Sequence, residues 1–214
     1  RIREELPGCD LVAEEGGGDV SGERPVVYAD PLDGTTNFAH GHPFFCVSIA
    51  LTQGTEVLAG AVVAPALGVE YVAARGGGVT RNGVACRVSG TSSLARSLLA
   101  TGFPYDNHTN RDNNVREFGA LTVQSRGVRR CGSAALDLCF VADGAYDGYW
   151  ERKLGPWDIA AGTLCVLEAG GTCTDFGGGN VDFRVGALVA SNRLVHQELL
   201  GALARARTEP PFIL

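Results

Sequence analysis

The segment Asp30-Pro31-Leu32-Asp33-Gly34-Thr35-Thr36-Asn37 decides both the fold and the function of this chain, and it directly follows the β-rich run Pro25–Ala29. Its proline and glycine predict an irregular turn at the end of a strand. Such a turn aims two carboxylates and a backbone carbonyl at one point, as a hard, oxygen-seeking cation requires. Gly34-Thr35-Thr36 predicts the start of a short helix, whose free N–H groups and positive dipole end favour a phosphate. An ordinary Asx-type turn is the structural alternative, because Asp and Gly are common turn residues.

Two further acidic segments have equally ordinary explanations when each is taken alone. Glu14 and Glu15 end an apolar run just before the strand, which is typical of a solvated edge. Asp158 lies in the first turn of an expected helix, where an Asp most often serves as a cap. Small residues follow Asp158 and allow that helix to pack closely. Together, these two segments shift the balance from an ordinary turn at Asp30–Asn37 toward a metal site.

The three segments resemble the inositol monophosphatase family, whose signature is G-E-E, then D-P-[LI]-D-G-T-[TS]-N-F, then W-D-x-A-[AG]-G. The matching residues are Ala13-Glu14-Glu15, Asp30 to Phe38 and Trp157 to Gly162, and the resemblance runs in order through essentially the whole chain. Ala13 replaces the usual glycine. The family has two helices and an Asp-bearing segment upstream of the position of Arg1, so N-terminal helices are expected to be missing from this chain.

The resemblance implies a Mg²⁺ site with two ions. Glu14, Asp30 and the Leu32 carbonyl would hold one ion, and Asp30, Asp33 and Asp158 the other. Two divalent ions about 3.5–4 Å apart lower the pKa of a bound water and stabilise both the attacking and the leaving oxygen. Phosphoryl transfer depends mainly on positioning and charge stabilisation, so no covalent nucleophile is required.

The resemblance also assigns the residues that would handle water and substrate. The implied catalytic residues are Glu14, Asp33 and Thr35, of which Glu14 and Thr35 would position the attacking water. Gly34 and Thr35 would offer N–H groups to the phosphate. The alcohol part of the substrate would contact Gly132, Ser133, Ala134 and Glu151.

The implied fold is an α/β layered αβαβα sandwich formed by one domain over residues 1–214. Within it, a strand-rich lobe for metal and phosphate is expected over about 1–92, and a mixed α/β substrate lobe over about 93–214. The implied activity is Mg²⁺-dependent hydrolysis of a small polyol phosphate monoester, first of all myo-inositol monophosphate, by a lithium-sensitive homodimer. The alternatives are a relative that acts on histidinol phosphate, fructose 1,6-bisphosphate or a 3'-phosphonucleotide, and a family member with an added regulatory role, because some bacterial relatives act in transcription complexes.

Substrate preference is predicted from Thr36 and Glu151. Relatives that act on nucleotide 3'-phosphates or histidinol phosphate often have Lys where Thr36 stands here. Glu151 would accept hydrogen bonds from ring hydroxyls and repel a second phosphate. No nearby cation is clearly assigned to neutralise such a phosphate. Arg152 and Lys153 follow Glu151 in the sequence, but neighbours in a strand alternate faces, so at least Arg152 should face away. Polyol monophosphates are therefore expected to be better substrates than bisphosphates.

Hydrophobic patterns predict the other elements. Strands are expected over Cys46–Leu51, Val57–Val63 and Val69–Ala74, and Asn82-Gly83 indicates a hairpin. The expected helices are an amphipathic one over Asn113–Gln124, a buried one over Ser133–Ala142 with Ser133 as N-cap, a third over Asp158–Ala169, and a fourth over Leu194–Ala206 capped by Asn192.

Composition narrows the class of protein further. The net charge of -6 and pI of about 5.2 argue against nucleic-acid binding, and the basic residues Arg126, Arg129 and Arg130 are interpreted as solvated surface. No apolar run is long enough for a membrane span. The chain has seven cysteines, no C-x-x-C pair and no basic leader at its start. These features predict that the protein is located in a reducing compartment, the cytoplasm. His40 and His42 form a weaker candidate metal pair, since Mg²⁺ prefers oxygen ligands.

Overall fold

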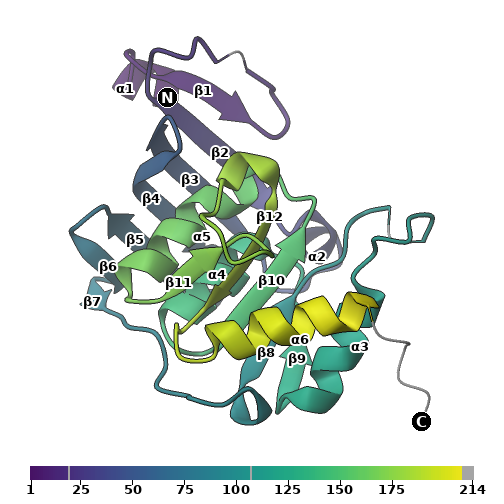
Figure 1. The fold of residues 1–214 in the computed structure, drawn as a ribbon. Helices are drawn as coiled ribbons and strands as arrows, with labels where there is room; N and C mark the ends of the chain where they lie inside the picture. The colour runs from purple at the N-terminus through teal and green to yellow at the C-terminus, as the bar shows by residue number, and fades with distance from the viewer. Residues whose placement is uncertain (19, 107, 209–214) are drawn as a thin grey trace.

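The computed structural model describes residues 1–18, 20–106 and 108–208, in which two β-sheets alternate with two pairs of helices (Figure 1). The first sheet has seven strands in the order β1 to β7, and only β1 and β2 run parallel. Its strands are β1 (Asp10–Ala13), β2 (Val26–Asp33), β3 (Cys46–Gln53), β4 (Glu56–Ala64), β5 (Val69–Ala74), β6 (Gly78–Arg81) and β7 (Val84–Ala85).

The second sheet has five strands in the order β11-β12-β10-β8-β9. β8 lies parallel to its neighbours β9 and β10, whereas β12 lies antiparallel to β10 and β11. Its strands are β8 (Leu98–Thr101), β9 (Gly127–Arg129), β10 (Gly148–Arg152), β11 (Thr172–Thr174) and β12 (Ala187–Ser191).

The helices form two further layers. α4 (Ala134–Ala142) and α5 (Pro156–Glu168) pack between the sheets, and most of their side chains are buried. α3 (Val115–Gln124) and α6 (His196–Thr208) cover the other face of the five-stranded sheet. The short helices are α1 (Ile2–Glu5), α2 (Thr35–Ala39) and the 3₁₀ turns Pro65–Leu67, Leu94–Arg96 and Phe183–Val185. The expected layered α/β fold is confirmed, and the described residues form four of its layers.

Most of the predicted elements are confirmed, with shifted ends. Asn82 and Gly83 both have positive φ, 50° and 77°, as a two-residue hairpin turn requires. The hydroxyl of Ser133 accepts a hydrogen bond from Leu136 N and so caps α4. α5 begins at Pro156 and not at Asp158, and α6 begins at His196 and not at Leu194. The strand β1 was not predicted.

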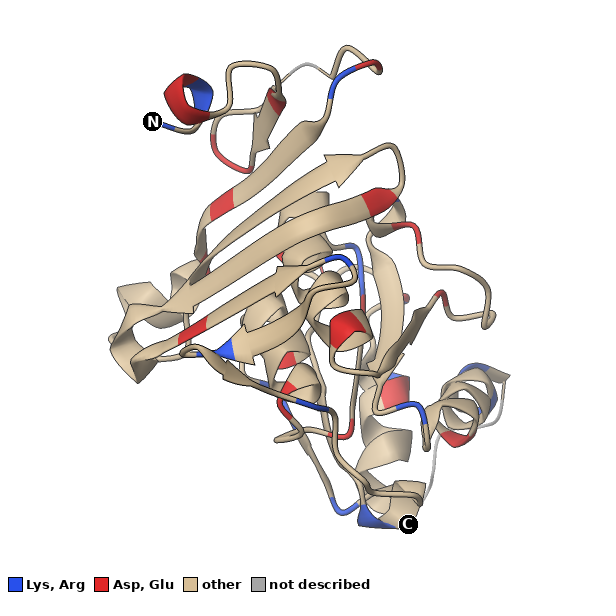
Figure 2. Ribbon diagram, turned by 90° about the vertical axis from the view of Figure 1, so that its left-hand side faces the viewer, with Lys and Arg blue, Asp and Glu red and all other residues tan. Residues whose placement is uncertain are grey.

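Charged residues are few on the strands of the seven-stranded sheet, as Figure 2 shows. Arg126, Arg129 and Arg130 are all exposed, as the sequence predicts. Within the described ranges, no helix has the length and apolar character that a membrane span needs. All seven cysteines are free thiols.

Candidate active site

A β-bulge in β2 brings Asp30 and Asp33 to the same side of the sheet. In a regular strand, residues three apart face opposite sides. Here Asp30 pairs with Ser48 and Asp33 pairs with Cys46, so β2 contains one more residue than β3 between the two pairs. The expected irregular turn is therefore wrong in detail, because the strand continues through this segment. Pro31 suits the bulge, because a proline has no N–H to donate to a neighbouring strand.

The start of α5 brings Asp158 to these two residues. The hydroxyl of Ser48 on β3 donates to Trp157 O at 3.0 Å and ties the start of the helix to the sheet. Asp158 Oδ2 accepts a hydrogen bond from Gly155 N at 2.7 Å, so the capping role is real. Asp30, Asp33 and Asp158 each also place one carboxylate oxygen within 4.8 Å of the others. A carboxylate has two oxygens, so Asp158 can cap the helix and belong to the cluster.

The start of α4 fixes the orientation of Asp33. Asp33 Oδ2 accepts hydrogen bonds from the Ser133 hydroxyl at 2.7 Å and from Ala135 N at 2.8 Å. Cys46 Sγ approaches the same oxygen at 3.8 Å. These contacts hold one carboxylate oxygen and leave Oδ1 for the cluster. Ser133 is almost fully buried, so its hydroxyl serves Asp33, and only its backbone is left to meet a substrate.

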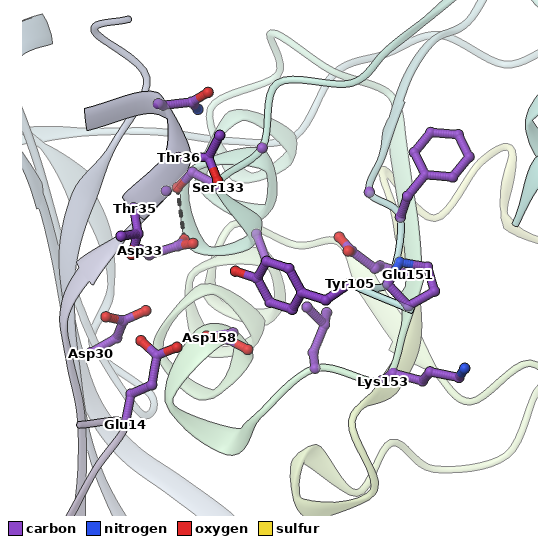
Figure 3. A pocket seen from close by; sticks show the side chains of 18 of the residues that line it. Glu14, Asp30, Asp33, Thr35, Thr36, Tyr105, Ser133, Glu151, Lys153 and Asp158 are labelled. Carbon is purple, nitrogen blue, oxygen red and sulfur yellow. Dashed lines mark hydrogen bonds between the residues drawn. The ribbon is translucent and has the colours of Figure 1, made fainter. Parts of the chain in front are cut away.

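Glu14 enters the same pocket from the turn after β1 (Figure 3). Its backbone N–H donates to Ala29 O at 3.3 Å, which holds that turn against β2. Glu14 is exposed and is not one of the three residues whose oxygens lie within 4.8 Å of one another. Figure 3 shows its carboxylate beside Asp30, where an additional ligand would stand.

Burial raises the pKa of all four carboxyl groups, and repulsion by neighbouring carboxylates adds to the shift of Glu14, Asp30 and Asp158. Burial, followed by the charge of Asp33, raises the pKa of Asp158 to about 8. Burial raises the pKa of Asp33 to about 6 and also raises that of Asp30. Burial and then the charge of Asp30 raise the pKa of Glu14 to about 7. Crowded carboxylates with oxygen as the only donor atom suit a hard divalent cation.

The candidate pair His40 and His42 does not join this site. Both residues are exposed, and His40 ends α2. In the part of the chain that the structure describes, the group of side chains able to hold a metal consists of Asp30, Asp33 and Asp158.

Gly34 begins α2 in a conformation that favours glycine. Its φ is 93°, and a Cβ there would lie 2.9 Å from Phe44 O. The Thr35 hydroxyl donates to Leu32 O at 3.0 Å, and Leu32 N donates to Asp30 Oδ1 at 2.8 Å. A carbonyl oxygen has two lone pairs, so Leu32 O can accept from Thr35 and still act as a ligand. The expected phosphate-binding residues thus border the acidic cluster.

The residues expected to contact the alcohol part of the substrate also line this pocket: Gly132, Ser133, Ala134 and Glu151. Ser133 lies beside Asp33, whereas Figure 3 shows Glu151 across the pocket from the acidic cluster. Glu151 is only 8% exposed, and the Tyr149 hydroxyl donates to its Oε2. Burial raises the pKa of Glu151 to about 7. Gly102 leaves space for this carboxylate, because a Cβ at Gly102 would collide with both of its oxygens.

Several pocket residues had no role assigned from the sequence. Gly102, Phe103, Pro104 and Tyr105 follow β8 and line the pocket, and Figure 3 shows the Tyr105 ring reaching across it toward the acidic side. Arg152 faces away, as expected, and its guanidinium carbon Cζ lies 3.3 Å from the centroid of the Phe176 ring. The sequence assigned no cation to neutralise a second phosphate, but two cationic residues, Arg130 and Lys153, line the pocket together with Glu151.

A cluster of oxygen ligands beside a helix start, within a layered α/β fold, is typical of metal-dependent phosphatases. Residues 1–209 match the model of the inositol monophosphatase family. An inositol-1-monophosphatase of Synechocystis sp. is 46% identical over 204 residues, which cover 95% of this chain and 71% of the relative. The Nus factor SuhB of Pseudomonas aeruginosa is 44% identical over 204 residues, which cover 93% of this chain and 75% of the relative.

The solved structure of an inositol monophosphatase from Anabaena (Nostoc) sp. superposes with a TM-score of 0.94 at 43% identity, covering 99% of this chain and 83% of that one. The chain belongs to the inositol monophosphatase family. It is a phosphatase, and its substrate is a small phosphate monoester.

Proposed function

We propose that this phosphatase hydrolyses small polyol phosphate monoesters, first of all myo-inositol monophosphate, in a reaction that requires Mg²⁺. The observation that carries the proposal is the cluster of Asp30, Asp33 and Asp158, whose carboxylate oxygens lie within 4.8 Å of one another. The name of the Synechocystis relative supports the choice of inositol phosphate.

The donor set fits Mg²⁺. It consists of oxygen atoms, it lies beside a helix start, and it includes one carboxylate, that of Asp33, that is oriented by two hydrogen bonds. Glu14, Asp30, Leu32 O, Asp33 and Asp158 would hold the ions. When bound, Mg²⁺ would supply charge stabilisation for the phosphate and make water a better nucleophile.

The protein's own groups would then position the reactants. Gly34 and Thr35 would offer backbone N–H groups to the phosphate oxygens, because these N–H groups begin α2 and precede its internal hydrogen bonds. Glu14 and Thr35 would orient the attacking water, with Asp33 held beside them. Glu151 would accept a hydrogen bond from a hydroxyl of the alcohol, while Gly132, Ser133 and Ala134 would form the floor beneath it.

The test is phosphate release from a panel of esters with and without Mg²⁺. The panel contains inositol 1-phosphate, histidinol phosphate, fructose 1,6-bisphosphate and a 3'-phosphonucleotide, which represent the alternative substrates. We expect inositol 1-phosphate to have the highest kcat/KM among the monophosphates and Glu151→Gln to reduce that preference. Activity that is unchanged after complete chelation would refute the proposed metal dependence.

The proposal extends to inhibition, assembly and location. We expect lithium to inhibit turnover. Light scattering should show a homodimer in solution, and cell fractionation should place the protein in the cytoplasm. A regulatory role in a transcription complex is the second candidate, supported by the name of the Pseudomonas relative. Co-purification of RNA polymerase with a catalytically inactive variant would support that second role.

A further inference from the structure

Lys153 lines the active-site pocket in a backbone conformation that favours glycine. Its φ is 62°, inside the left-handed region that is unfavourable for a long side chain. Figure 3 shows the side chain extending away from the acidic cluster, and its Nζ donates to both carboxylate oxygens of Asp106, at 2.9 and 3.0 Å. A strained residue at an active site whose side chain is committed to one partner indicates a task for that ion pair.

The ion pair fixes one end of the short segment that carries Tyr105. Asp106 follows Tyr105 directly and is held by Lys153, at the end of β10. On the other side of Tyr105, Pro104 is buried, and the Phe103 ring packs against Phe118 of α3 with ring centroids 5.5 Å apart. Tyr105 therefore stands between two fixed neighbours.

Tyr105 faces the acidic cluster with a hydroxyl that has no protein partner. Its side chain is 91% exposed although it lines the pocket, and within residues 1–18, 20–106 and 108–208 no hydrogen bond engages the hydroxyl. Loss of solvent on the pocket side, followed by the charges of the four site carboxylates, raises the pKa of this hydroxyl. Since the side chain as a whole is exposed, the charges are the cause that locates it, and Figure 3 shows the same direction.

A phosphate group would meet this hydroxyl on the acidic side of the pocket. The N–H groups of Gly34 and Thr35, the expected phosphate donors, border the same cluster. A phosphate carries several acceptor oxygens, and a phenolic O–H is a donor that can serve one of them. Hydrogen bonds to a charged acceptor are about twice as strong as bonds between neutral groups.

We propose that Tyr105 is a catalytic residue whose hydroxyl donates a hydrogen bond to an oxygen of the phosphate group being cleaved, and that Asp106 and Lys153 are positioning residues that hold Tyr105 there. This inference rests on the proposed function, which seats the phosphate at Gly34 and Thr35. The hydroxyl keeps its proton throughout. The contact is to the phosphate and not to the alcohol, so it is the same for every ester.

The first experiment compares Tyr105→Phe and Tyr105→Ala with the wild type in the full chain with Mg²⁺. Tyr105→Phe keeps the ring and removes the hydroxyl. It should lower kcat/KM by about tenfold, and by the same factor on inositol 1-phosphate and on a simple aryl phosphate. In calorimetric titration with inorganic phosphate and Mg²⁺, it should weaken binding by a similar factor. Tyr105→Ala should lose at least as much as Tyr105→Phe in both measurements.

The second experiment tests the ion pair through Tyr105. Asp106→Asn should lower kcat/KM and phosphate affinity by about threefold, whereas Lys153→Arg, which keeps the pair, should lose less. In the double variant with Tyr105→Phe, Asp106→Asn should cause no further loss, because its effect is transmitted by the hydroxyl that is already absent. Glu56→Gln is the matched control: Glu56 forms an exposed ion pair with Arg75 at 2.9 Å, lies outside the pocket lining, and should change neither measurement.

Four outcomes would overturn the inference. Tyr105→Phe could match the wild type, or lose activity on inositol 1-phosphate alone, which would place the hydroxyl at the alcohol. Tyr105→Ala could bind inorganic phosphate more tightly, which would show that the ring occupies the phosphate position. Asp106→Asn could add its full loss to that of Tyr105→Phe, which would separate the ion pair from Tyr105. If no ester is hydrolysed, the proposed function fails, and the phosphate titration still tests Tyr105.

Discussion

Replacing Asp158 by Asn separates its two roles. The Asp158 carboxylate accepts from Gly155 N at the start of α5 and also belongs to the acidic cluster. An Asn side chain keeps an oxygen that can accept from Gly155 N, so the cap, worth about 0.5–2 kcal/mol, should survive. The substitution removes the negative charge and one ligand. We therefore expect the metal-free fold to gain stability while Mg²⁺ binding and turnover are lost.

The size of the expected gain in stability follows from the raised pKa of Asp158. Burial and the charge of Asp33 move the pKa of Asp158 from 3.8 to about 8. A shift of this size sets an upper limit of roughly 6 kcal/mol, and the cost of burying the Asn amide reduces the net gain to on the order of 1–2 kcal/mol. For a chain of this length, 1 kcal/mol moves Tm by about 2–4 °C, so an increase of roughly 2–8 °C is expected.

The gain should depend on pH with a definite sign. A carboxyl group whose pKa is higher in the folded than in the unfolded state stabilises the fold while protonated and loses that contribution as pH rises toward the folded value. Asn does not titrate. The difference in Tm between Asp158→Asn and the wild type should therefore be small near pH 4–5 and largest near pH 8.

The assay is thermal unfolding of both proteins in chelator at these two pH values, followed by Mg²⁺ titration and turnover. The variant should lose most of the increase in Tm that Mg²⁺ gives the wild type, and its kcat should fall by orders of magnitude. A variant that melts lower than wild type at pH 8 and keeps its activity would refute the reasoning. Asp158 would then act only as a helix cap.

The remaining predictions concern the metal and the residues around it. Chelation should abolish phosphate release, Mg²⁺ should restore it, and Ca²⁺ should restore it poorly, because Mg²⁺ prefers compact octahedral geometry with retained water; equal rescue by Ca²⁺ would contradict this. Ser133→Ala should remove a buried hydrogen bond to Asp33, lowering stability by about 1–2 kcal/mol and weakening Mg²⁺ binding in a titration monitored by Tm. Gly102→Ala should displace the Glu151 carboxylate and raise KM for inositol 1-phosphate more than KM for a simple aryl phosphate; equal changes would place Glu151 outside the alcohol site.

The parts of the site that the sequence predicts are those with local signals. Asp30, Asp33 and Gly34 stand in one short segment, and Asp158 stands in the first turn of a helix that small residues continue. The N-cap role of Ser133 is likewise readable from its position before an apolar run. Each of these signals lies among neighbours in the sequence, and the resemblance to the family joined the acidic ones into one site.

The parts that the sequence does not predict depend on partners far along the chain. The bulge between Asp30 and Asp33 exists only in the register with β3, and strand register is set by pairing and burial, not by one segment. The bond from Ser133 to Asp33 joins residues 100 positions apart. Arg130 was correctly expected to be exposed, but its place in the pocket depends on the positive φ of Gly132 and on the approach of Asn37.

Small residues on α5 explain why the cluster is so compact. A Cβ at Gly60 on β4 would lie 3.0 Å from Ala161 Cα, and a Cβ at Gly162 would lie 2.6 Å from Leu138 Cβ on α4. α5 thus packs directly against the sheet on one side and against α4 on the other. Asp158 begins this helix, so any displacement of α5 from β4 would also move Asp158 away from Asp30. The small residues after Asp158, first noted as permitting close packing, therefore set the distance between the carboxylates of the site.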